Sequence, residues 1–158
     1  MWQRLRRRRP AASRVPVFYS PEWVAAFNAA VADLDVSSVD AGPSLAVTDG
    51  GFRVAQVVHD VPNDREIREI RVVLALADGR LAMGLEPTDG PTNEPVNVTL
   101  SLSYEDAAAL SRGEVDPATL VGTGRVRVRG DLSVLVAGQT LLASAAPRLA
   151  QLQAATTY

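Results

Sequence analysis

The pattern of apolar and polar positions predicts one helix near the N-terminus, followed by several strands. Ser20-Pro21-Glu22 has the residues that favour a helix start, and apolar side chains recur behind it at helical spacing: Trp23, Phe27, Ala30, Val31 and Leu34. Alternating apolar positions then predict strands at residues 45–49 and 52–60 around Asp49-Gly50-Gly51, at 70–76, at 81–85 after the turn Asp78-Gly79, and at 96–102.

The last third of the chain predicts a short helix, a further helical turn, a strand and a long helix. Ser103 is suited to cap the short helix, which Gly113 ends, and Asp116-Pro117 begins the next turn, up to Gly122. Val126 and Val128 alternate with arginines in the last strand. An apolar helix then covers residues 132–143, and Pro147 breaks or kinks it.

These elements predict an α+β fold, because the strands are bracketed by helices and show no βαβ alternation. We expect a five- to six-stranded, mostly antiparallel sheet that helices cover on one face. The first 14 residues contain six of the 16 basic residues and none of the 18 acids. Residues 1–16 are therefore predicted to be a disordered, arginine-rich arm, and residues 17–155 a single domain.

Composition narrows the function classes. Outside the arm the chain is acidic, which argues against nucleic acid as its main partner. The chain has no cysteine, which fits a reducing cytoplasm, and we expect a cytoplasmic protein. No run of about 18 apolar residues is present, and the basic N-terminus lacks a following apolar stretch, so neither a transmembrane helix nor a signal peptide is expected.

Residues for catalysis are scarce. The one histidine, His59, precedes Asp60, but neighbours in a strand point to opposite faces and we expect no His–Asp pair. A single histidine without cysteine leaves no usual zinc site, and no phosphate-binding or nucleophile motif occurs. The sequence predicts no enzyme, no metal and no cofactor.

Three arginines, Arg125, Arg127 and Arg129, are predicted to share one face of the last strand. The favoured interpretation is a solvated face or protection of a sheet edge. The alternative is transient contact with anionic lipid headgroups, and the N-terminal arm has the same two interpretations.

Residues 100–135 resemble the sterol carrier protein-2 family of lipid-binding domains. The resemblance rests on Leu110-Ser111-Arg112-Gly113-Glu114-Val115-Asp116-Pro117 and on Gly124-Arg125-Val126-Arg127-Val128-Arg129-Gly130-Asp131, at the spacing that the family shows. Arginines stand where the family usually has lysines, and residues 20–95 match only in the order of elements. Departures are the small Val121 before the turn and the start of the last helix, Leu132-Ser133-Val134-Leu135, where methionines are common.

The resemblance implies an apolar tunnel between sheet and helices that binds sterols, fatty acids or acyl-CoA without chemistry; the fold also occurs as an accessory domain of larger bacterial enzymes. The wall residues that it implies are Leu100, Leu102, Leu110, Leu120, Val126, Val128, Leu132 and Leu135. Asn97, Thr99 and Gln139 are hypotheses for polar groups at the mouth.

Two hypotheses follow. The first is a module that binds an apolar small molecule in a cavity. The second is an interaction module of the same fold with a filled core, acting as a homodimer or as the partner of an enzyme. A connected cavity with Trp23, Phe27, Leu74, Met83, Leu100 and Leu135 in its wall favours the first, and uniform packing favours the second.

Overall fold

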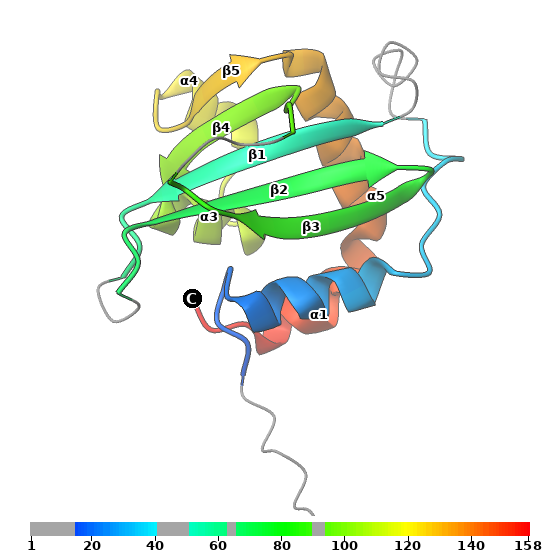
Figure 1. Cartoon of the computed structure of the whole chain (residues 1–158), viewed down its shortest axis with the longest axis horizontal. Coiled ribbons are helices and arrows are strands. Elements are labelled where there is room, and N and C mark those ends of the chain that lie inside the picture. The colour runs from blue at the N-terminus through cyan, green and yellow to red at the C-terminus, as the bar shows by residue number, and fades with distance from the viewer. Residues whose placement is uncertain (1–14, 41–50, 63–65, 90–93) are drawn as a thin grey trace, which may run out of the picture.

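The computed structural model describes residues 15–40, 51–62, 66–89 and 94–158 (Figure 1). Within them the elements are α1 (Pro21–Val31), β1 (Phe52–His59), β2 (Glu69–Ala77), β3 (Arg80–Glu86), β4 (Val98–Ser103), α3 (Tyr104–Ser111), α4 (Pro117–Gly122), β5 (Arg127–Gly130) and α5 (Leu132–Ala155). The predicted strand at 45–49, its turn, and most of the predicted arm lie outside the described residues. The predicted α+β class is confirmed.

The sheet has five strands in the order β3-β2-β1-β4-β5. The pairs β2–β3, β1–β2 and β4–β5 are antiparallel, and β1–β4 is parallel, so the sheet is mostly antiparallel, as predicted. In the register of the central strands, Val54 lies opposite Leu74 on one side and Val98 on the other. Because side chains alternate along a strand, these three residues share one face of the sheet.

Helices cover that one face. In Figure 1, α5 crosses behind the sheet and meets α1, which lies along the β3 edge. The Asn28 side chain holds α1 there: its Nδ2 donates to the Met83 carbonyl at 2.8 Å, and its Oδ1 accepts from the Met83 N–H at 2.7 Å. Asn28 therefore pairs with the N–H and the C=O of Met83, which would otherwise lack partners because β3 is an edge strand.

The helix starts follow their capping residues. Ser20 Oγ accepts from the Trp23 N–H at 3.1 Å at the start of α1, and Ser103 Oγ accepts from the Asp106 N–H at 3.1 Å at the start of α3. Asp131 accepts from the Ser133 N–H at 2.9 Å and begins α5. Each of these caps satisfies a backbone donor that the first helical turn leaves free.

The helix α5 continues through Pro147 to Ala155. Of the two effects predicted for Pro147, a break or a kink, the break therefore does not occur. Proline has no N–H, so it cannot donate to the carbonyl four residues earlier, that of Ala143. Ala143 is exposed, so water can donate to this carbonyl instead.

By length and mean hydropathy α5 is also long and apolar enough to cross a membrane, which the sequence had not led us to expect. Ala137, Leu141 and Ala145 are fully buried, so its apolar character also serves the core.

The folded chain continues past residue 155, where the domain was predicted to end. Thr157 donates its N–H to the Pro16 carbonyl at 3.0 Å, and Tyr158 packs against the Phe18 ring with centroids 5.1 Å apart. The C-terminal residues and the segment before α1 therefore lie side by side at one end of the molecule.

Candidate functional site

A cavity of about 510 Å³ lies between the sheet and the helices. Nine of the twelve residues predicted for its wall line it: Trp23, Phe27, Leu74, Met83, Leu100, Leu102, Leu110, Val126 and Leu135. Its volume falls within the range of about 300–1,000 Å³ that small-molecule sites occupy. That these nine residues bind a ligand stays a prediction.

The sheet supplies the floor of the cavity. Val54 and Gln56 on β1, Leu74 on β2, Met83 on β3 and Leu100 on β4 all point to the helical side. The two-residue period of a strand places them there, and the register brings Leu74 opposite both Val54 and Met83. A continuous apolar surface results, with Gln56 as its one polar side chain.

One face of α5 forms the opposite wall. Leu135, Gln139, Leu142, Ala146, Leu149 and Gln153 line the cavity and recur every three or four residues. Across from them lie Leu110, Val115 and Val121, from α3, α4 and the turn between them. Gln139 and Val121 are exposed, so the cavity meets solvent between α5 and this segment.

Three predicted wall residues do not line the cavity. Leu132 is 58% exposed, because it occupies the first turn of α5 on the side that faces solvent. Leu120 is fully buried in the core. Val128 is half-buried on the edge strand β5, packed against the core. The family resemblance implied all three as wall residues, but a match of apolar positions does not fix the direction in which each side chain points.

The residues before α1 add an aromatic cluster that the sequence had not assigned to the site. Phe18 and Tyr19 line the cavity; their rings stack with centroids 3.9 Å apart, and Trp23 meets the Tyr19 ring edge-on at 5.3 Å. Tyr19 has a left-handed backbone, φ 59°. A bulky residue rarely adopts this conformation, and packing on several sides holds it there.

Tyr19 and Gln56 form a polar contact inside the cavity. The Tyr19 hydroxyl donates to Gln56 Oε1 at 2.6 Å. Burial, and to a lesser degree Tyr158 and Tyr104, raises the pKa of Tyr19, so its hydroxyl stays protonated in ordinary solutions. A signal for Gln56 does exist in the sequence: it is the polar residue in the inward series Phe52, Val54, Gln56, Val58.

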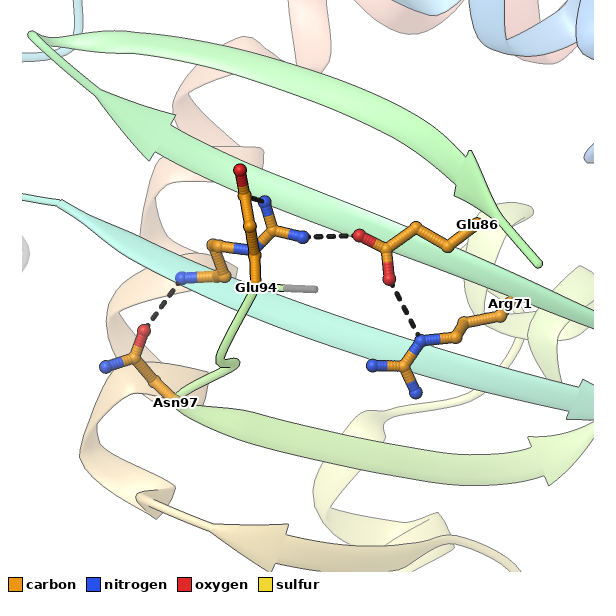
Figure 2. Close-up of polar contacts among 5 residues, drawn as sticks. Arg71, Glu86, Glu94 and Asn97 are labelled. Carbon is orange, nitrogen blue, oxygen red and sulfur yellow. Dashed lines mark hydrogen bonds and ion pairs between the residues drawn. The ribbon is translucent and has the colours of Figure 1, made fainter. Parts of the chain in front are cut away.

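Of the three predicted mouth residues, Gln139 lines the cavity and the other two do not. Asn97 Oδ1 accepts from the Arg53 N–H at 2.8 Å, as Figure 2 shows, and Thr99 lies opposite Ala55 and Arg129 on the other face of the sheet. The hypothesis of a place at the mouth is therefore wrong for both residues, and strand alternation turns Thr99 away from the helices.

The open face of the sheet carries a network of charges (Figure 2). Glu86 bridges two arginines: one oxygen pairs with Arg53, and the other accepts from Arg71 Nε at 3.1 Å. Arg53 also pairs with Glu94. Ala55 and Val73, which lie opposite each other on the same face, are buried although no described helix lies there.

The three arginines near β5 do not form one row. Arg125 precedes the strand, and its guanidinium pairs with Asp106, a carboxylate that is only 4% exposed. The chain bends at residues 125–126 and β5 begins only at Arg127, so strand alternation does not extend to Arg125. Arg127 and Arg129 lie opposite Ser101 and Thr99 and therefore project from the open face of the sheet. The prediction of one shared face is thus wrong for Arg125.

His59 and Asp60 do form a pair, contrary to the sequence expectation. His59 Nδ1 lies 2.8 Å from Asp60 Oδ2. Asp60 follows the end of β1 in a left-handed conformation, φ 57°, so strand alternation no longer applies to it. Both side chains are exposed and neither lines the cavity. In the part of the chain that the structure describes, no group of acids and histidine is arranged to hold a metal ion.

The fold and the cavity define a class: an α+β domain whose sheet and helices surround an apolar cavity with few polar groups. The model of the SCP-2 sterol transfer family matches residues 20–143, so the chain belongs to that family. The resemblance seen in the sequence is thereby confirmed. No curated protein sequence matches the chain.

Solved structures share the fold at low sequence identity. A conserved hypothetical protein of Thermus thermophilus, described as possibly a sterol carrier protein, is 16% identical, with a TM-score of 0.54 over 89% of this chain and 90% of its own. A sterol carrier protein 2 crystal structure is 17% identical, with a TM-score of 0.54 over 81% of this chain and 96% of its own.

The solution structure of sterol carrier protein domain 2 of Helicoverpa armigera is 18% identical, with a TM-score of 0.50 over 81% of this chain and 93% of its own. A sec-alkylsulfatase of Pseudomonas, Pisa1, is 20% identical over 56% of this chain, with a TM-score of 0.40. The chain spans only 12% of the length of that enzyme.

Proposed function

We propose that this protein binds and carries an apolar small molecule in the cavity between sheet and helices, without catalysing a reaction. The observation that carries the proposal is the cavity itself: about 510 Å³, with the floor and opposite wall formed mainly by aliphatic and aromatic side chains. Burial of apolar surface, at about 25 cal/mol per Å², would drive binding. Membership of a sterol transfer family agrees with a lipid or sterol-like cargo.

The alternative is the interaction module with a filled core. A filled core would leave no space of this size, because packed protein interiors contain few voids larger than a water molecule. All six residues that were expected to separate the two hypotheses, from Trp23 and Phe27 to Leu100 and Leu135, line one cavity. This favours the carrier.

Uptake of a fluorescent fatty acid with an environment-sensitive probe tests the proposal. We expect saturable binding with one site per chain, a blue shift of the emission, and displacement by an unlabelled apolar competitor. Emission that stays unshifted both for this probe and for its methyl ester, at a tenfold molar excess of protein over probe, would contradict the carrier function.

We further propose transient contact with an anionic membrane surface through Arg127 and Arg129. Both side chains are exposed on the open face of the sheet, on the edge strand. A cationic side chain near an anionic membrane contributes about 1 kcal/mol to binding, and salt screens this attraction.

The variant that tests membrane contact is Arg127→Ala with Arg129→Ala. Arg125 is left unchanged, because removing it would leave the buried Asp106 carboxylate without its partner. On vesicles with an anionic phospholipid, the double variant is expected to bind more than tenfold less at low salt, since the two charges contribute about 2 kcal/mol. Equal binding of the wild type and the double variant, or binding that does not weaken as the salt concentration rises, would contradict the proposal.

A further inference from the structure

Gln56 is a polar side chain in an apolar wall. It lies on β1, the central strand of the sheet, between Val72 on β2 and Leu100 on β4, and all three line the cavity. An amide on such a surface is unfavourable unless its hydrogen-bonding groups find partners. Its position on a strand with neighbours on both sides holds it more firmly than a loop would.

Only half of this amide is satisfied by the protein. Oε1 accepts from the Tyr19 hydroxyl at 2.6 Å. The Nε2 group can donate two hydrogen bonds, and no acceptor for it is found among the described residues. Nε2 is also not enclosed by protein atoms, so its donors face the space of the cavity.

Tyr19 fixes which end of the amide faces the cavity. Its ring is held between Phe18, stacked at 3.9 Å, and Trp23, edge-on at 5.3 Å. Its hydroxyl donates to the amide oxygen at 2.6 Å. The nitrogen of Gln56 is therefore the end presented to a ligand.

The lining carries no charge that could neutralise an ionised ligand. Apart from Tyr19, none of the described residues that line the cavity is ionisable, and Arg112, which stands between the lining residues Ser111 and Gly113, is paired with Glu114 at 2.8 Å. A carboxylate placed at Gln56 would lose its hydration without gaining a counter-charge. A neutral carbonyl oxygen would lose little hydration and would accept a hydrogen bond from one of the two N–H groups of Nε2.

We propose that the cavity selects an uncharged apolar molecule with a carbonyl oxygen, a ketone or an ester, and that Gln56 is the residue that recognises this oxygen. This inference rests on the proposed carrier function and names the chemical class of its cargo. A fatty-acid anion bound with its tail inside and its carboxylate at the mouth is the competing arrangement, and it would not use Gln56.

Three ligands of similar length separate these arrangements: methyl dodecanoate, dodecanoate at pH 8 and tetradecane, each supplied from cyclodextrin and measured by displacement of a fluorescent probe. The variant is Gln56→Leu, which keeps the side-chain size and removes the donors. We expect its affinity for the ester to fall roughly tenfold while its affinity for the alkane is unchanged or rises. In the wild type, the ester is expected to bind more tightly than the carboxylate.

Tyr19→Phe is the second variant, because it removes only the hydroxyl that orients Gln56; we expect a smaller loss, roughly threefold, for the ester alone. Thermal unfolding confirms that both variants are folded. An ester-to-alkane affinity ratio that is the same in wild type and variants, or a carboxylate that binds as tightly as the ester, overturns this inference alone. Absence of binding by all three ligands to the wild type overturns the carrier function itself.

Discussion

Replacing Gly130 with alanine is expected to lower the free energy of unfolding by about 3–4 kcal/mol. Gly130 is the last residue of β5, directly before the start of α5, and its φ is 109°. Residues other than glycine rarely adopt this backbone conformation. A Cβ at this position would overlap the carbonyl oxygen of Asn97 and lie 2.9 Å from Val98 Cα. That carbonyl cannot move away easily, because it accepts from the Asp131 N–H at 2.9 Å.

Chemical denaturation measures this loss, and the matched control is Gly122→Ala. Gly122 ends α4, has an ordinary backbone angle, and a Cβ there would meet nothing within 4 Å. We expect the control to change stability by no more than about 0.5 kcal/mol. Equal stability of the two variants would show that the β5–α5 connection tolerates a side chain, and that its geometry is not the one described.

Filling the cavity is expected to block ligand uptake. Leu135→Trp places a larger ring on the face of α5 that lines the cavity, opposite Leu100 and Leu110. The indole would occupy space that a ligand needs, and we expect probe affinity to fall at least tenfold, a loss of about 1.4 kcal/mol or more. The fluorescent probe titration measures it, with thermal unfolding to confirm that the variant is folded.

Leu132→Trp is the matched control, in the same helix and with the same substitution. Leu132 is 58% exposed and does not line the cavity, so probe affinity is expected to stay within twofold of the wild type. A loss of binding in both variants would favour the wall predicted from the sequence, which includes Leu132 as well as Leu135, over the one in the structure.

Much of the fold could be predicted from the sequence, because helix caps, turns and strand alternation each depend on a few neighbouring residues. Ser20 and Ser103 cap the helices that they were expected to begin, and Asp78-Gly79 forms the turn between β2 and β3. Strand alternation placed Leu74 and Leu100 each on the apolar face of its own strand, and the register of the sheet brings these faces together. The parallel pairing of β1 with β4 has no such local signal, since it depends on how the whole chain packs.

The residues of the candidate site could be predicted where they follow from the period of a strand. They could not be predicted where they depend on the direction in which a helix starts. Leu132 and Leu135 are both apolar and close together, yet only the start and angle of α5 decide which one faces the cavity. The sequence pattern makes Arg125 part of an alternating strand, but in the structure its guanidinium pairs with Asp106, 19 residues earlier, and not with the open face of the sheet. Gln56 is polar, so the apolar periodicity that marks its neighbours Val54 and Val58 does not mark it as part of the wall.

Native mass spectrometry of the protein, purified from a bacterial host and followed by extraction of lipids, tests the carrier function most directly. The account predicts a co-purifying apolar molecule, at one per chain, that is present with the wild type and with Leu132→Trp and is lost with Leu135→Trp. A protein that carries no such mass, and that takes up neither a fluorescent fatty acid nor its methyl ester, would contradict the account and favour the interaction module.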